Sequence, residues 1–279
     1  MIPLICGLVA IVSWLAFLFF GRRLLNSIGQ EGREQGLHFE LQAAPRSDHH
    51  VESMLAHNPR SPILLRQYVA NAIDRNDLVE ALRRSEMFVT RAPRAPEAWV
   101  AHADVLRRSG RAEESVAVLR KAMRRLPRRV EILAAWAHEA LERQDWAEVV
   151  RRFVPVRRRA PRRIDGYAEP AKALAHVGRP DEAEQLIAEG LVQLADVADM
   201  WHQAAHIADI VGKLDEAIGR WEAMRERFPG EPGGYSFGAE GLARAGRAAE
   251  AEELIRQARD FFPGDKHVAE VAAQGSAAG

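Results

Sequence analysis

The sequence is almost without cysteine and has little lysine. Cys6 is the only cysteine among 279 residues, which excludes an internal disulfide framework and any metal site built on two or more thiolates. Lysine supplies four of the 39 basic residues, so arginine carries nearly all of the positive charge. The formal net charge of zero argues against a uniformly basic nucleic-acid-binding protein. With 47% hydrophobic and 28% charged residues, the composition also excludes wholesale disorder.

Charge is absent from residues 2–20, which read IPLICGLVAIVSWLAFLFF. As a helix this stretch would measure roughly 28 Å, close to the hydrocarbon thickness of a bilayer. No basic residue precedes it, and Phe20, Gly21 and Arg22 follow it where a signal peptide would have a small-residue cleavage site. Cys6 comes too early for a lipoprotein anchor. We therefore expect residues 1–21 to form a retained transmembrane anchor.

The charges beside this segment predict its orientation. Arg22, Arg23 and Arg33 follow it, whereas only the α-amine precedes it. The positive-inside bias then places the rest of the chain in the cytoplasm, as a single-pass protein of a bacterial inner membrane. Residues 22–47 contain several glycines and Pro45, and they are expected to form a juxtamembrane linker.

Prolines recur at a period of 34 residues, and only Ala195 interrupts the series. The prolines are Pro59, Pro93, Pro127, Pro161, Pro229 and Pro263. They divide the chain into six units, 62–95, 96–129, 130–163, 164–197, 198–231 and 232–265. A large apolar residue stands fourth in each unit, and small or β-branched residues stand eighth and twentieth. A fixed period of this length is typical of a solenoid built from repeated supersecondary units.

The fifteenth residue of each unit predicts a turn. It is glycine in four units (Gly110, Gly178, Gly212 and Gly246), Asn76 in the first and Gln144 in the third. Glycine and asparagine adopt the left-handed conformation that ends a helix, and acidic residues follow at the start of a second helix. The proline of the series then ends that second helix. At Gln144 we expect a looser turn.

This pattern closely resembles the tetratricopeptide repeat (TPR), and the resemblance covers residues 62–265. It implies an all-α, right-handed superhelical solenoid of six helix–turn–helix units, here preceded by one transmembrane helix. Residues 48–61 are expected to form an N-terminal half-repeat with a lone second helix over 48–58. Residues 266–279 are expected to form a short capping helix over Lys266–Gln274 and a tail.

The resemblance further implies a concave groove lined by the first helices, at positions two, five, nine, twelve and thirteen of each unit. The groove residues are Arg66, Asp104, Arg107, Arg108, His138, Lys172, His202, His206 and Asp209, with Glu142, His176, Glu240 and Arg244 beside them. This polar lining suits a protein or peptide partner of mixed charge. The paired asparagines of the family's carboxylate clamp are missing, so a chaperone C-terminal tail is not expected.

Charge is unevenly distributed along the chain. Residues 91–163 carry 19 basic and nine acidic side chains, a net of +10, and residues 164–279 carry 11 and 21, a net of −10. The densest basic run is Arg151, Arg152, Arg157, Arg158, Arg159, Arg162 and Arg163. The run is either a solvated helix face or a docking site for an acidic partner or anionic headgroups. Nucleic acid is not expected because no aromatic residues are interleaved, whereas the opposite charges permit self-association.

Catalytic and metal-binding patterns are weak. His202, His206 and Asp209 share one helical face, but a metal site would need more ligands. Gly234–Gly238 spell the G-x-S-x-G string of serine hydrolases around Ser236, yet here they open a predicted helix instead of following a strand. No phosphate-binding loop or C-x-x-C occurs. We expect neither an enzyme, nor a cofactor, nor a bound metal ion.

Three hypotheses remain for the function. The first is a membrane-tethered scaffold or adaptor that recruits partner proteins, with an architecture similar to the anchored repeat proteins that regulate bacterial lipopolysaccharide synthesis. Those proteins carry a rubredoxin-like module built on paired C-x-x-C, which this sequence lacks. The second is a periplasm-facing assembly factor of the cytochrome c maturation or outer-membrane assembly type. The third, a remote one, is a hydrolase or metal site at Ser236 or at His202 and His206.

Overall fold

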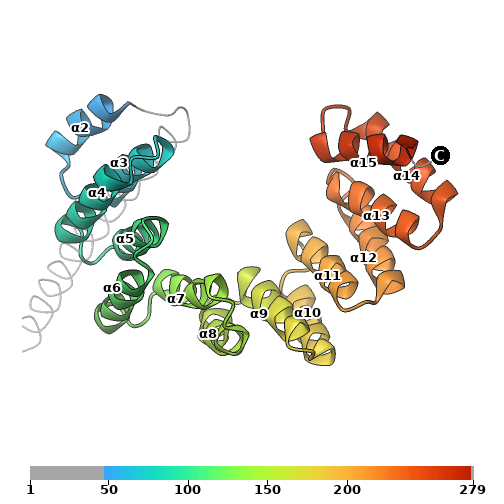
Figure 1. The fold of residues 1–279 in the computed structure, drawn as a ribbon, viewed down its shortest axis with the longest axis horizontal. Helices are drawn as coiled ribbons and strands as arrows, with labels where there is room; N and C mark the ends of the chain where they lie inside the picture. The colour runs from blue at the N-terminus through green and yellow to red at the C-terminus, as the bar shows by residue number, and fades with distance from the viewer. Residues whose placement is uncertain (1–46, 278–279) are drawn as a thin grey trace, which may run out of the picture. The chain divides into compact units, whose positions relative to one another are not determined.

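The computed structural model describes residues 47–277, and its regular structure there is entirely α-helical (Figure 1). The helices are α2 (Asp48–His57), α3 (Pro62–Asp74), α4 (Leu78–Arg91), α5 (Pro96–Arg108), α6 (Ala112–Arg125), α7 (Val130–Glu142), α8 (Trp146–Arg159), α9 (Asp165–His176), α10 (Pro180–Gln193), α11 (Ala198–Ile210), α12 (Leu214–Arg227), α13 (Gly233–Arg244), α14 (Ala248–Phe261) and α15 (Lys266–Ala277). None of these helices is long and apolar enough to cross a membrane. The anchor expected at residues 1–21 lies outside the described residues, as does the linker before Ser47.

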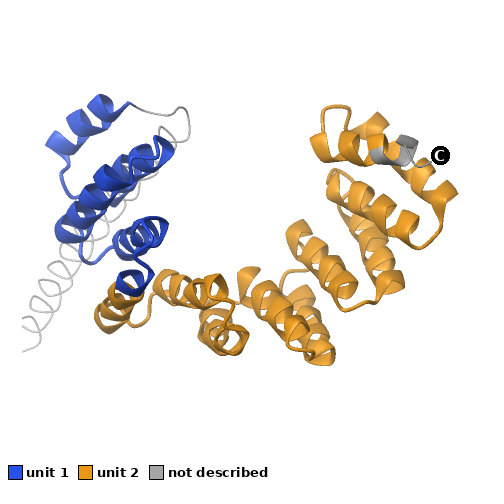
Figure 2. Ribbon diagram, viewed as in Figure 1, with its two compact units in different colours: residues 1–115 blue, residues 116–279 orange. Residues whose placement is uncertain are grey.

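The helices belong to two compact units, residues 1–115 and residues 116–279 (Figure 2). In the first unit, α3 packs against α2, α4 and α5. In the second unit, each helix from α7 to α15 packs against its neighbour in the chain, and α9 and α13 also contact α11 and α15, respectively. The odd-numbered helices from α3 to α13 are thus the first helices of successive pairs, and the even-numbered ones are the second helices.

Small side chains allow the two helices of each pair to approach closely. All six residues at position eight and all six at position twenty are buried, and Ala137, Ala171, Ala183 and Ala217 are completely inaccessible. Larger apolar residues fill the space beside them, such as Phe153 in α8 and Ile187 in α10, both 0% exposed. These are the positions at which the 34-residue pattern predicted a core.

The turns between paired helices have the same geometry in all six units. Residue fifteen has a positive φ in each, including the two residues that are not glycine, Asn76 (56°) and Gln144 (54°). In every case the next backbone N–H donates to the carbonyl five residues earlier, as from Asp145 to Ala140 at 3.0 Å and from Arg179 to Leu174 at 2.9 Å. The expectation of a looser turn at Gln144 is wrong, because these hydrogen bonds enforce the left-handed conformation even on glutamine.

Gln144 should therefore carry a removable backbone strain. We expect Gln144→Gly to raise the free energy of unfolding by about 0.5–1 kcal/mol, since glycine adopts a positive φ without a steric cost. Gly178→Ala should lower it by about 1 kcal/mol, although nothing lies within 4 Å of an added Cβ there. Thermal unfolding followed by circular dichroism measures both, and equal midpoints for the two variants would contradict the explanation.

The fourth residue of each unit is more than a large apolar group. Trp99 and Trp201 donate their indole N–H groups to the carbonyls of Pro93 and Ala195, at 2.9 and 3.1 Å. The Tyr167 hydroxyl donates to the Pro161 carbonyl at 3.0 Å. Each acceptor lies six residues earlier, where the preceding second helix has ended. The aromatic side chain thereby satisfies a carbonyl in the loop between two units.

Arginines at position 23 link the second helices in every other unit. They are Arg84, Arg152 and Arg220, and each donates to the carbonyl 16 residues earlier and to the glutamate four residues earlier. In the second, fourth and sixth units position 23 is apolar, and the glutamate at position 19 pairs instead with an arginine at position 16. These pairs are Arg111–Glu114, Arg179–Glu182 and Arg247–Glu250. The 34-residue period thus contains an alternation with a period of 68 residues.

Two helix ends differ from the sequence prediction. The lone helix predicted for residues 48–58 is α2, and it begins where the Ser47 hydroxyl accepts a hydrogen bond from the His50 N–H. The last helix was expected to end at Gln274, but α15 continues to Ala277.

Candidate functional site

The predicted groove residues of the first unit lie on α3 and α5. Arg66 is exposed on α3. On α5, the Asp104 carboxylate accepts hydrogen bonds from Arg107 at 2.7 Å and from Arg108 at 2.8 Å. These three charges compensate one another within one helix, so they offer a partner a local network of mixed charge.

Most of the predicted groove residues of the second unit are also paired with neighbours. His138 lies 3.3 Å from the Asp165 carboxylate, and Lys172 lies 3.2 Å from Glu169. Burial opposes the ionisation of Asp165, but hydrogen bonds from His138 and Arg163 outweigh it and hold the pKa of that carboxyl well below its usual range. Asp165 therefore remains ionised, and it holds its partners in place.

Two further predicted residues also contact groups outside their own helices. Asp209 of α11 accepts a hydrogen bond from Arg244 of α13 at 2.8 Å. The His176 ring stacks on Trp146 with the ring centroids 4.4 Å apart. Both contacts join consecutive helix pairs, so they stabilise the stacking of the repeats as well as lining a surface.

Aromatic rings from three first helices form a continuous contact in the second unit. Phe237 of α13 lies between His202 of α11, at 4.7 Å between ring centroids, and His267 of α15, at 4.3 Å. His206 lies one turn after His202, with the two rings 6.3 Å apart and nearly parallel. We call His202, His206, Phe237 and His267 the aromatic–histidine surface.

Buried polar atoms without hydrogen-bond partners surround this surface. They are the indole nitrogen of Trp221, Oε1 of Gln203 and Nε2 of His267. The Trp221 ring lies 6.4 Å from Phe237. His267 Nε2 is 3.8 Å from the Glu240 carboxylate, which is close enough for attraction but too long for a hydrogen bond. Unsatisfied buried groups are rare in folded proteins, and here they gather beside a half-exposed phenylalanine.

His202 should make stability depend on pH. Burial, and next the charge of His206, lower the pKa of His202 below its ordinary value of 6.5, with Lys172 and His267 acting in the same direction and Asp199 opposing them. The unfolded chain then binds the proton more readily, so this contribution to stability is present above pH 6.5 and is lost as the pH falls. Between pH 7 and 5, His202→Gln should lose less stability than the wild type in urea unfolding. Parallel losses would contradict this assignment.

Sequence reasoning assigned no role to Phe237 or His267. Phe237 stands at position six, outside the groove positions that the resemblance implies. His267 stands at position two of a frame that continues beyond the sixth unit, because α15 begins where a seventh first helix would begin. That continuation was the available signal.

The predicted basic run does not form one uncompensated patch. Arg152 is 8% exposed and lies over the Trp136 ring at 3.9 Å. Four others have acidic partners, in the pairs Arg151–Glu148, Arg157–Glu189, Arg162–Asp196 and Arg163–Asp165. Only Arg158 and Arg159 are exposed and without an ion pair among the described residues. The solvated-face interpretation accounts for most of this run.

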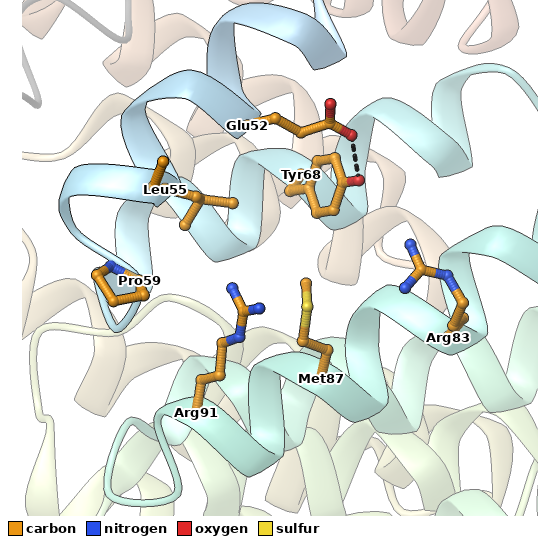
Figure 3. A pocket seen from close by; sticks show the side chains of 8 residues that line it. Glu52, Leu55, Pro59, Tyr68, Arg83, Met87 and Arg91 are labelled. Carbon is orange, nitrogen blue, oxygen red and sulfur yellow. Dashed lines mark hydrogen bonds between the residues drawn. The ribbon is translucent and has the colours of Figure 1, made fainter.

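A pocket of about 430 Å³ lies in the first unit between α2, α3 and α4 (Figure 3). Its apolar lining comes from Leu55, Ala56, Pro59, Tyr68 and Met87, and its charged lining from Glu52, Arg83 and Arg91. The Tyr68 hydroxyl donates to the Glu52 carboxylate at 2.5 Å. Desolvation, and next this hydrogen bond to Glu52, raise the pKa of Tyr68. The phenol therefore stays protonated and acts as a donor at the pocket.

The residues considered for catalysis occupy ordinary helical positions. Ser236 is 1% exposed inside α13, where its hydroxyl donates to the Pro232 carbonyl at 3.2 Å. A serine in that setting is not on a nucleophile elbow, which needs a strand before it. Within residues 47–277 no three His, Cys, Asp or Glu side chains are grouped so that they could hold a metal ion.

No protein-family model matches the sequence, and a comparison with curated proteins found no match. Solved structures do resemble the fold. Yeast Tom70 gives a TM-score of 0.64 at 14% identity over 83% of this chain and 50% of the Tom70 chain. A tetratricopeptide repeat protein from Parabacteroides merdae gives 0.58 at 13% identity over 88% of this chain and 98% of that one.

A third similar structure is a chain of the APC/C hetero-tetramer Cut9–Hcn1. It gives a TM-score of 0.53 at 11% identity over 90% of this chain and 48% of that one. This chain thus spans about half the length of the chains that it matches in Tom70 and Cut9–Hcn1. Together with the helix pairs described above, these similarities show that the chain has the TPR fold.

Proposed function

We propose that the protein is an interaction scaffold, and that its aromatic–histidine surface binds a segment of a partner protein. The observation that carries this proposal is the position of Phe237, half-exposed between His202 and His267 on three successive first helices. Aromatic side chains at the centre of a surface patch are typical anchors of protein interfaces. A contribution from several helices also suits an extended or helical peptide better than a small molecule.

The charges around this surface favour a basic partner segment. Asp199 is exposed on α11 and Glu270 is exposed on α15, while Glu240 lies beside His267 without a hydrogen bond to it. Arg244 is already paired with Asp209. The preferred ligand is therefore a cationic segment with one aromatic or aliphatic side chain that packs against Phe237. That the Cut9–Hcn1 structure is a hetero-tetramer is consistent with partner binding by this fold.

We propose in addition that residues 2–20 hold the scaffold in a bacterial inner membrane, with the repeats in the cytoplasm. The support is their length of 19 residues without a charge and the arginines that follow them. A reporter fused after Gly279 tests the orientation. Activity of a reporter that works only in the periplasm would favour the periplasm-facing assembly factor instead.

A charge reversal tests the scaffold proposal. Full-length protein carrying Glu240→Lys should retain at least fivefold less of its co-purifying partners than the wild type, as quantified by mass spectrometry after mild membrane extraction. Glu252→Lys on α14 is the matched control, because Glu252 is also exposed to solvent but lies on a second helix. If both variants retain every partner, or lose the same ones, the aromatic–histidine surface is not the binding site.

A further inference from the structure

The pocket in the first unit contains one charge that nothing in its surroundings compensates. Arg83 donates two hydrogen bonds to Glu80, at 2.7 and 2.6 Å. Glu52 accepts the hydrogen bond from Tyr68. Arg91 is exposed, and no ion pair joins it to another of the described residues. Its guanidinium extends beside the apolar part of the pocket, near Leu55 and Met87 (Figure 3).

The apolar part of the pocket is large enough for one or two side chains. Its 430 Å³ falls at the lower end of the range of about 300–1,000 Å³ for ligand sites. Met87 and Leu55 face each other across it from α4 and α2, and Tyr68 of α3 lies between these helices (Figure 3). Methionine adapts to side chains of different shapes, so this lining suits an aliphatic group better than a rigid cofactor.

We propose that this pocket binds a helix of a partner protein, which inserts one aliphatic side chain between Leu55 and Met87 and pairs a carboxylate one turn away with Arg91. Two helices flank the pocket, and a groove between helices suits an amphipathic helix whose anchors are three or four residues apart. A phosphate group is a poorer fit, because it needs several donors and only one guanidinium is unpaired beside the Glu52 carboxylate. This site does not depend on the aromatic–histidine surface of the second unit.

Synthetic peptides provide the direct test. The probe is a capped alanine-based helical peptide with one leucine and, one turn later, one glutamate, added to full-length protein labelled with ¹³C at the methionine methyl groups. The Met87 methyl resonance should shift in a saturable manner. The versions with serine in place of the leucine, or glutamine in place of the glutamate, should bind at least twofold more weakly. The proposal is overturned if the Met87 resonance does not move, or if all three peptides bind equally.

Variants of the protein separate the two contacts. Arg91→Ala should weaken binding of the glutamate peptide by roughly two- to fivefold, the range for an exposed ion pair, and should leave the glutamine peptide unaffected. Ala56→Leu should abolish binding of both peptides, because the new side chain fills the pocket from an exposed position that the fold does not need. Arg94→Ala, another exposed arginine three residues beyond Arg91, is the matched control. Equal effects of Arg91→Ala and Arg94→Ala would overturn the carboxylate contact.

Discussion

Replacing Arg84 by alanine should lower the free energy of unfolding of the first unit by about 3 kcal/mol, the lower end of the range for breaking a buried ion pair. Arg84 is 4% exposed. Its guanidinium donates to Asp48 at 2.5 and 3.0 Å, to Glu80 at 2.7 Å and to the Tyr68 carbonyl at 2.7 Å, and it lies 3.6 Å from the Tyr68 ring. Without it, Asp48 retains Arg75 and Asn71, but Glu80 and the Tyr68 carbonyl lose a buried donor.

Arg83→Ala is the matched control, since Arg83 is adjacent, binds the same Glu80 and has a side chain 59% exposed. Its loss should cost about 0.2–1 kcal/mol, as is usual for exposed pairs. Urea unfolding gives both values, and hydrogen exchange should show the amides of α2 opening first in Arg84→Ala. The Arg84 guanidinium also holds the pKa of Asp48 well below its usual range, so that pKa should rise in the variant. Equal costs at the two arginines would refute the alternating link between second helices.

Replacing Gly190 by leucine should destabilise the second unit by about 3 kcal/mol, a typical upper value for overpacking a core. Gly190 lies within α10, where a helix would ordinarily gain stability from any other side chain. Here an added Cβ would lie 2.8 Å from Met200 Cε and 3.0 Å from Tyr167 Cγ. Both neighbours are almost completely buried, so they have little room to move. The glycine allows α9 and α11 to pack on α10.

Gly219→Leu is the matched control for this prediction. Gly219 also lies within a second helix, α12, but it is exposed and nothing lies within 4 Å of an added Cβ. Leucine there should raise the free energy of unfolding by about 0.5–1 kcal/mol through helix propensity alone. Thermal and urea unfolding of both variants check the pair. A neutral Gly190→Leu would show that the contact of α10 with Tyr167 and Met200 is loose.

The features that the sequence predicts best depend on a single side chain acting in its own unit. A small residue at position eight or a glycine at position fifteen has the same effect wherever it occurs, because the backbone geometry around it repeats. The helix boundaries follow the same logic, since Pro62 and Pro96 open helices and the series of prolines closes them. Gln144 was misjudged because intrinsic preference is weaker than the hydrogen bonds of the turn.

The features that the sequence did not predict depend on pairs of residues. Whether Arg152 is a free surface charge or a buried link depends on Glu148 and Trp136 together, and composition counts it as basic in either case. The aromatic–histidine surface unites side chains that are 30 or more residues apart, from helices whose neighbours are known only after folding. The pocket beside Arg91 forms between α2 and α4, and no periodic signal marks a gap between helices.

The alternation of arginines at position 23 has a consequence for the length of the solenoid. Two consecutive units form the smallest block that contains both kinds of second helix, and Arg84 and Arg220 each reach back 36 residues to an acidic partner in the preceding unit. Removing or duplicating one unit would place two arginine-bearing helices, or two apolar ones, side by side. A change of 68 residues would keep every donor opposite its acceptor. The array can therefore grow and shrink evenly by pairs, much as a two-colour tiling can only be extended by whole tiles of both colours.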